Sequence, residues 1–208
     1  MTTQPEHPAG AGCVYIIDDD EAIRDSLGWL LQSRDVETRA FASAEAFLAV
    51  WSADLAGCVL LDIRMDGMSG LALFDRLRDA GNRMPVIFLT GHGDVPIAVA
   101  SLKKGAHDFV EKPFNDNELV DRIIEALTLD ATTRSQNSAR QDAATRLASL
   151  SPRERQVMDK IIEGKLNKII ADELAISMRT VEMHRAHVFE KMGVKNSVEL
   201  ARMLALLD

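Results

Sequence analysis

The sequence predicts an α/β domain built on a five-stranded, parallel, doubly wound sheet, followed by a domain made only of helices. Over roughly the first 125 residues, short apolar runs alternate with amphipathic stretches, a pattern typical of alternating strands and helices. From Ser151 onward only helical spacing remains. The chain has 208 residues, which is enough for two domains that each bury a core.

The five apolar runs are the candidate strands of the sheet. They cover Cys13–Ile17, Val36–Phe41, Cys58–Leu61, Pro85–Leu89 and Asp108–Val110. Between them lie helical patterns, in which Ile23, Leu27 and Leu30 for example recur at intervals of four and three residues. Cys13 and Cys58 have neither metal-binding nor redox spacing, so we expect reduced thiols in the core.

The acidity of the chain belongs to its first part. Residues 1–150 hold 14 Lys and Arg against 23 Asp and Glu, a net charge of −9, whereas residues 151–208 hold 10 against 9, a net charge of +1. The second part therefore permits binding to nucleic acid without demonstrating it. Residues 1–12 lack the features of a signal peptide and are expected to form a disordered tail. Because no apolar run could cross a bilayer, we expect a cytoplasmic protein without a membrane partner.

A polar stretch at residues 128–149 separates the two predicted domains. It contains no Pro or Gly and few large apolar residues, so it is either a flexible linker or a solvated helix, and we favour a linker with helical tendency. Ser151, Pro152 and Glu154 then have the pattern of a helix start, with a capping Ser and a Glu three residues later. We expect four helices from there to Asp208.

Acidic and polar residues follow the predicted strands where their carboxyl ends meet at one edge of the sheet. Asp18–Glu21 follow the first strand, Asp62 the third, Thr90 the fourth and Lys112 the fifth. Crowded carboxylates repel one another unless a cation lies among them, and Mg²⁺ prefers such oxygen ligands. A further carboxylate beside that cation can attack a phosphoryl group. The edge is therefore a candidate site of phosphoryl transfer.

Four motifs, in this order, resemble the receiver domains of two-component response regulators: IIDDDEAIRDSL, LLDIRMDGMSG, FLTGHGD and DFVEKPF. The resemblance covers roughly residues 12–128 and places a receiver domain at residues 13–127. It implies a flavodoxin-like sheet with strand order 2-1-3-4-5. It also implies a regulator that is phosphorylated by a sensor histidine kinase and is not itself an enzyme.

The same resemblance assigns the residues of phosphoryl transfer. Asp62 would be the phosphoacceptor. Mg²⁺ would be held by Asp18, Asp19, Asp62 and the backbone carbonyl of Arg64. One residue departs from the family pattern, because the position of Asp66 is usually Pro. A looser loop and an added negative charge would shift the phosphoryl lifetime or the metal affinity rather than abolish the chemistry.

The resemblance also assigns residues that would respond to the phosphoryl group. Thr90 and Lys112 would each bind one of its oxygens, and Lys112-Pro113 would be a cis peptide. Phe109 would be a switching aromatic side chain, with an ordinary core residue as the alternative. The family's strand order would bring the strands of Cys13 and Cys58 side by side, so these cysteines could be near neighbours.

Residues 150–204 resemble the LuxR-type helix-turn-helix of the NarL/FixJ family of regulators, and we place this domain at residues 150–208. Its recognition helix would be Met178–Met192. The residues that follow the family pattern are Glu154, Gly164, Lys168, Ala171, Leu174, Ser177, Thr180, Val181, His184 and Lys191. A helix that projects after such a turn suits the major groove of DNA.

The predicted DNA contacts are of two kinds. Glu182 and Arg185 would contact base edges, and Met183 would touch a thymine methyl group. Phosphate contacts are assigned to Lys168, Arg179, Thr180 and Lys191. For His184 and His187, a DNA contact and a purely structural role stay open alternatives.

The sequence thus predicts a transcription factor gated by phosphorylation of Asp62. Phosphorylation would draw in Thr90 and Phe109, reshape the surface of the fourth helix and fifth strand, and promote a homodimer on promoter DNA. RNA polymerase is a further candidate partner. One alternative, a Mg²⁺-dependent phosphatase, generally needs an acid two residues after the nucleophile, where this chain has Arg64. Another, a receiver that serves only for dimerisation, is favoured by Asp66 alone.

Overall fold

The computed structural model describes residues 12–91 and 95–207, and its backbone contacts divide the chain into two units between Arg134 and Ser135. The predicted tail at residues 1–12 lies outside the described residues except for Gly12, and so do His92 and Gly93 of the fourth strand's motif. None of the described helices is both long enough and apolar enough to cross a membrane.

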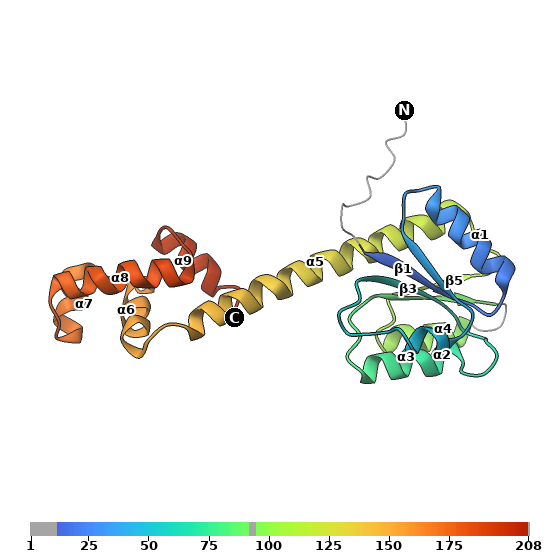
Figure 1. Cartoon of the computed structure of the whole chain (residues 1–208), viewed down its shortest axis with the longest axis horizontal. Coiled ribbons are helices and arrows are strands. Elements are labelled where there is room, and N and C mark those ends of the chain that lie inside the picture. The colour runs from blue at the N-terminus through green and yellow to red at the C-terminus, as the bar shows by residue number, and fades with distance from the viewer. Residues whose placement is uncertain (1–11, 92–94, 208) are drawn as a thin grey trace, which may run out of the picture. The chain divides into compact units, whose positions relative to one another are not determined.

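The first unit is the predicted α/β domain, with strands and helices alternating along the chain (Figure 1). Its elements are β1 (Cys13–Ile17), α1 (Glu21–Gln32), β2 (Thr38–Phe41), α2 (Ala44–Leu48), β3 (Gly57–Asp62), α3 (Gly70–Asp79), β4 (Val86–Thr90), α4 (Val95–Lys103), β5 (Asp108–Glu111) and the start of α5 (Asp116–Ala148). The strands pair in parallel in the order β2-β1-β3-β4-β5. The predicted fold class and strand order are confirmed.

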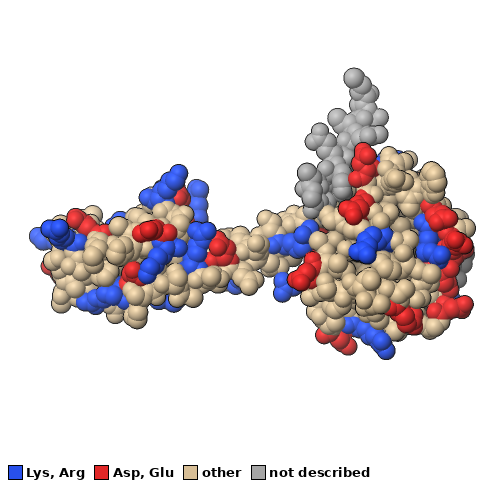
Figure 2. Space-filling view, viewed as in Figure 1, with Lys and Arg blue, Asp and Glu red and all other residues tan. Residues whose placement is uncertain are grey.

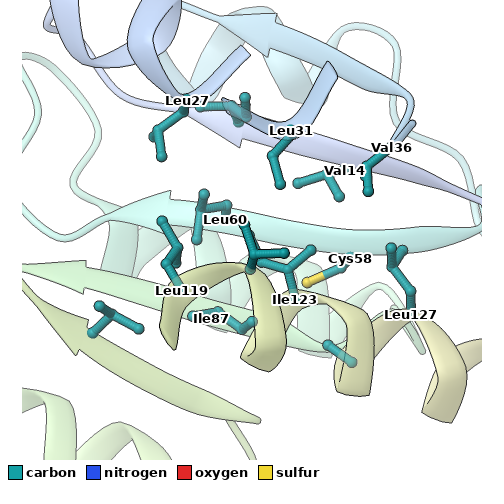
Figure 3. Close-up of a cluster of buried hydrophobic side chains, with 14 of the residues drawn as sticks. Val14, Leu27, Leu31, Val36, Cys58, Leu60, Ile87, Leu119, Ile123 and Leu127 are labelled. Carbon is teal, nitrogen blue, oxygen red and sulfur yellow. The ribbon is translucent and has the colours of Figure 1, made fainter. Parts of the chain in front are cut away.

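Each face of this sheet has its own hydrophobic core. Helices α1 and α5 cover one face, where Leu27, Leu60 and Ile123 pack together (Figure 3). Helices α2, α3 and α4 lie on the other face (Figure 1), over a core that includes Phe47 and Phe88. Successive strand residues point to opposite faces, so strands buried on both sides read as continuous apolar runs. This is why the strands could be recognised in the sequence.

Cys13 and Cys58 lie on neighbouring strands but on opposite faces of the sheet. In the β1–β3 register Val14 stands beside Cys58, and Cys13 stands beside Gly57. The suggestion that the two thiols are near neighbours is therefore wrong, because the one-residue offset turns their side chains apart. Both are free cysteines. Burial raises the pKa of the Cys13 thiol to about 11, and burial also raises the pKa of the Cys58 thiol.

Helix α5 continues to Ala148, so residues 128–148 are helical. Its start contributes Leu119 and Leu127 to the core of the α/β unit. Its last turns belong to the second unit, where Ala143 is 1% exposed and Leu147 packs on the helical core.

The second unit contains, after α5, the four predicted helices α6 (Pro152–Ile162), α7 (Asn167–Leu174), α8 (Met178–Met192) and α9 (Ser197–Leu204). The predicted start of α6 is confirmed: Ser151 accepts a hydrogen bond from the Glu154 N–H, and Glu154 accepts one from the Ser151 N–H. The core of the unit includes Val157, Val181 and Val188, which are fully buried.

Candidate functional site

The polar residues predicted to converge lie at the carboxyl edge of the sheet. Asp18 follows β1, Asp62 ends β3, Thr90 ends β4 and Lys112 follows β5. Asp18, Asp62 and Thr90 are 1%, 7% and 0% exposed. Burial of two carboxylates and a hydroxyl at one edge is unfavourable unless each finds a partner, so their partners define what the site can do.

Lys112 connects two of the strands through its ammonium group. Its Nζ lies 2.7 Å from Oδ2 of Asp18 and 2.7 Å from Oδ1 of Asp62. Burial opposes the positive charge, but the hydrogen bonds to the two carboxylates outweigh burial and raise the pKa of Lys112. The ammonium therefore stays charged and offsets the repulsion between the two carboxylates.

The pKa of Asp62 is raised above its ordinary value, although some of its neighbours favour the ionised form. Burial raises its pKa and the nearby Asp18 adds to this, whereas the bonds from Lys112 and from the Arg64 N–H favour the ionised form. The Arg64 N–H donates to Oδ2 of Asp62 over 2.7 Å. The carboxylate is thus held at both oxygens, one by a side chain and one by the backbone.

Thr90 supplies a hydroxyl without a partner. Its Oγ1 is buried and has no hydrogen-bond partner in the described part of the chain. A buried hydroxyl left unpaired costs free energy of about 1–3 kcal/mol. Its donor is therefore not used by the described residues, which the contact predicted between Thr90 and a phosphoryl oxygen would require.

The remaining predicted metal ligands are less enclosed. Asp19 is exposed, and its Oδ2 accepts a hydrogen bond of 2.9 Å from the Asp66 N–H. Within the described residues, no three acidic, His or Cys side chains are drawn together at metal-binding spacing; the ammonium of Lys112 bridges Asp18 and Asp62 instead. The donor set consists of carboxylates and a backbone carbonyl, which fits the chemistry of Mg²⁺.

Phe109 lies on β5 and is half-buried against the core on the α2–α4 side of the sheet. Lys112-Pro113 is a cis peptide bond, as predicted. The structure thus places Phe109 one strand away from Thr90, because β4 and β5 pair with Phe88 beside Phe109.

In the second unit, α7 and α8 form a helix-turn-helix. Helix α7 ends at Leu174, and the next residue, Ala175, caps it in the left-handed conformation with a φ of 52°. The Ser177 side chain then accepts from the Thr180 N–H and caps α8. Buried Ile170 and Val181 join the two helices. The bounds of α8, Met178–Met192, are those predicted for the recognition helix.

The residues assigned to DNA are mostly exposed. Lys168 on α7 and Arg179, Glu182 and Met183 on α8 point to solvent. On the face that Figure 2 shows, the helical unit carries several Lys and Arg side chains with Asp and Glu side chains among them. Some assigned side chains already have partners: the Thr180 hydroxyl lies 2.8 Å from that of Ser177, and the Arg185 guanidinium lies 5.5 Å from the ring centre of Phe189.

Lys191, assigned to a phosphate, is bound within its own domain. Its Nζ lies 2.7 Å from Oε2 of Glu154, which is 5% exposed. The bonds from Lys191 and from the Ser151 backbone lower the pKa of Glu154 to about 2. The ion pair ties α8 to the start of α6. The two histidines of α8 whose role the sequence left open have different surroundings. His187 Nδ1 lies 3.7 Å from Glu154, and His184 Nδ1 is buried without a partner in the described chain.

Sequence reasoning missed Arg146. Its Nη1 donates to the Met192 carbonyl over 3.0 Å, at the C-terminal end of α8, and its Nε pairs with Asp142 over 2.9 Å. Gly193 follows with a φ of 66°, and a Cβ there would lie 1.8 Å from Arg146 Nη1. The contact depends on α5 remaining helical as far as Ala148, which the sequence left open.

The comparisons with known proteins agree with this geometry. Residues 14–124 match the response regulator receiver domain, and residues 148–204 match the bacterial regulatory proteins of the luxR family. The C4-dicarboxylate transport transcriptional regulatory protein DctR of Rhodobacter capsulatus is 53% identical over 91% of this chain and 98% of its own. The transcriptional regulatory protein FixJ of Bradyrhizobium diazoefficiens is 45% identical over 92% and 94%.

Solved structures of the same kind cover nearly the whole chain. The response regulator StyR matches with a TM-score of 0.83 at 37% identity, over 94% of this chain and 97% of its own. Full-length FixJ from B. japonicum matches with a TM-score of 0.58 at 44% identity and the same coverage. Receiver domains generally bind Mg²⁺ for phosphorylation by a histidine kinase, and luxR-family domains bind DNA. The chain therefore belongs to the NarL/FixJ family of two-component response regulators, which are transcriptional regulators rather than enzymes.

Proposed function

We propose that this protein accepts a phosphoryl group on Asp62 from a histidine kinase, and that phosphorylation promotes dimerisation and sequence-specific binding to promoter DNA. The observation that carries the proposal is the pairing of Asp62 with Lys112 at 2.7 Å. Thr90, which follows the strand partner of Asp62, adds a buried hydroxyl that has no partner among the described residues. A nucleophile, a cation and a spare donor are the groups that transfer of a phosphoryl group requires.

The transfer itself needs little from the protein beyond positioning. A carboxylate oxygen of Asp62 forms the new O–P bond while the P–N bond to the kinase's phosphohistidine breaks, and the histidine nitrogen keeps the electron pair. Lys112 pairs with one phosphoryl oxygen, and the Thr90 hydroxyl donates a hydrogen bond to another. Each contact offsets negative charge that a buried site would otherwise penalise.

The proposed metal ligands are Asp18, Asp19, Asp62 and the backbone carbonyl of Arg64. When bound, Mg²⁺ supplies positive charge that stabilises the transferring phosphoryl oxygens. In the unphosphorylated chain Asp18 lies 2.7 Å from the Lys112 ammonium, so the ammonium would have a second partner beside Asp62 when Asp62 carries the phosphoryl group.

The proposed response joins Asp62 to the surface of α4 and β5. Thr90 would move toward the phosphoryl group, and Phe109, one strand away, would follow. Ile97 and Val99 on α4 are 39% and 41% exposed, which supports an apolar contact between two copies at this surface. A two-fold dimer would then present two copies of α8 to a two-fold DNA site.

In the DNA complex we assign base contacts to Glu182, Arg185 and Met183, because they lie on α8 and can reach base edges. Phosphate contacts are assigned to Lys168, Arg179, Thr180 and Lys191. The Lys191 contact requires an ammonium that also binds Glu154. A cytoplasmic location and RNA polymerase as a partner of the DNA-bound dimer stay predictions.

The test compares wild type with Asp62→Asn, with and without acetyl phosphate and Mg²⁺, by DNA binding and by light scattering. We expect the phosphodonor to produce a dimer and tighter DNA binding in the wild type, and neither change in the variant. Equal DNA binding by both proteins without phosphoryl transfer would contradict the proposal and favour a receiver that serves only as a dimerisation module.

A further inference from the structure

We propose that the backbone N–H of Asp66 is a positioning group for Asp19, and that it holds one carboxylate oxygen so that the other faces the metal. The inference rests on the proposed function, because Asp19 is there a ligand of Mg²⁺. It is carried by the hydrogen bond of 2.9 Å from the Asp66 N–H to Oδ2 of Asp19. That bond joins the loop after β3 to the end of β1.

The loop from Ile63 to Ser69 is held by carboxylates at three backbone N–H groups. The Arg64 N–H donates to Asp62, the Asp66 N–H to Asp19 and the Met68 N–H to Oε1 of Glu45, at 2.7, 2.9 and 3.2 Å. Two of these acceptors are proposed metal ligands. The loop backbone therefore orients ligand carboxylates as well as offering its own carbonyl at Arg64.

The chemistry of the bond explains why it would matter for the metal. Both residues are exposed, so an Asp19 side chain without the bond would sample several rotamers in water. Fixing Oδ2 leaves Oδ1 as a single donor, which suits a Mg²⁺ site built from a few carboxylates and water. A ligand ordered before binding costs less entropy when the metal arrives.

Residue 66 separates this backbone effect from the effect of its side-chain charge. Proline has no N–H and cannot make the bond, whereas alanine keeps the N–H and loses only the carboxylate. Asp66→Pro and Asp66→Ala both remove one negative charge. Any difference between the two variants therefore reports the backbone rather than the charge.

The first measurement is the Mg²⁺ dissociation constant of the unphosphorylated full-length protein, obtained from the rise in Tm with Mg²⁺ concentration. Trp29 and Trp51 both lie in the α/β unit, so Trp fluorescence follows the domain that holds the site. We expect Asp66→Pro to bind Mg²⁺ about fivefold more weakly than Asp66→Ala, a factor that corresponds to about 1 kcal/mol. We expect Asp66→Ala to stay within about twofold of wild type.

The second measurement needs no metal and no proline. Hydrogen exchange of the Asp66 amide is compared between wild type and Asp19→Ala, and removal of the acceptor is expected to speed exchange about fivefold. The Arg64 amide, whose acceptor is Asp62, serves as the internal control and should keep its rate. This comparison tests the bond even if Asp66→Pro fails to fold.

The outcomes separate the inference from the function on which it rests. Equal Mg²⁺ affinity of Asp66→Pro and Asp66→Ala, or unchanged exchange of the Asp66 amide in Asp19→Ala, would overturn the inference and leave phosphorylation of Asp62 untouched. A wild type that binds no Mg²⁺ at all would overturn the metal step of the proposed function, and the inference with it.

Discussion

The Nζ of Lys112 lies 2.7 Å from Oδ1 of Asp62 and at the same distance from Oδ2 of Asp18. One ammonium thus joins two buried carboxylates that follow different strands of the sheet. Without it, two like charges would face each other in a partly desolvated site, which is unfavourable. The same three groups are those proposed to handle the phosphoryl group, so stability and function are linked at this point.

The first prediction concerns that ammonium. Lys112→Met is expected to lower the free energy of unfolding of the α/β unit by about 3 kcal/mol, because it removes the countercharge of two buried carboxylates, Asp18 and Asp62. Lys104→Met is the matched control, since Lys104 pairs with Asp75 at the surface and both side chains are about half exposed; its effect should be below about 1 kcal/mol. Urea denaturation followed by Trp fluorescence measures both. If Lys112→Met loses no more unfolding free energy than Lys104→Met does, the ion pairs of Lys112 add little to stability.

A second prediction concerns the Thr90 hydroxyl, which is buried and has no hydrogen-bond partner within residues 12–91 and 95–207. Thr90→Val keeps the shape and removes the hydroxyl, so the unphosphorylated protein should gain about 1 kcal/mol of stability, or at least lose none. The same variant should lose most of the increase in DNA affinity that acetyl phosphate gives. Thr90→Ser keeps the hydroxyl and should retain that increase. If acetyl phosphate increases the DNA affinity of Thr90→Val as much as that of the wild type, the Thr90 hydroxyl is not needed for the response to phosphorylation.

The sequence sufficed for those features that follow from regular geometry. Strands buried on both faces read as apolar runs, and a parallel sheet brings their carboxyl ends together, so Asp62, Thr90 and Lys112 could be placed at one edge in advance. The ion pair between Lys112 and Asp18 could not be predicted, because it depends on the conformation of the flexible Lys112 side chain. The Cys13–Cys58 offset needed a register exact to one residue, which apolar runs do not supply.

The end of α5 was ambiguous for a different reason. Its polar residues 128–148 contain no Pro or Gly and no apolar stripe, so local propensity does not separate a helix from a linker. The last turns of this helix make contacts with the rest of the helical unit, among them those of Leu147 and Arg146. Such contacts join residues that are distant in the sequence, and local sequence patterns do not predict them.

A third prediction tests the contact at the C-terminal end of α8. Arg146→Ala should lower the stability of the helical unit by about 1 kcal/mol and weaken specific DNA binding about threefold, because the Met192 carbonyl loses its donor. Arg140→Ala is the matched control: Arg140 donates to the Leu207 carbonyl over 2.9 Å, after α9 rather than α8. Its removal should leave DNA affinity unchanged. Equal losses of DNA affinity would mean that Arg146 acts through charge and not by positioning α8.

The last prediction follows from the low pKa of Glu154. The bond to Lys191 lowers that pKa from 4.5 to about 2, so the native state favours the ionised carboxylate. A group with a depressed folded pKa stabilises the protein above its unfolded pKa and loses that contribution as the pH falls through the folded value. The wild type should therefore exceed Glu154→Gln in stability by about 2 kcal/mol at pH 7, and the difference should shrink between pH 4.5 and pH 2.

The Glu154 comparison is made by urea denaturation of the full chain. Because both Trp residues lie in the α/β unit, a far-UV CD transition without a fluorescence change reports the helical unit. Glu163→Gln is the control, since Glu163 pairs with Lys160 and Lys165 at the surface, where solvent screens the charges. It should show no resolvable difference at either pH. A Glu154→Gln deficit that stays constant down to pH 2 would mean that lost packing, and not the ion pair with Lys191, is responsible.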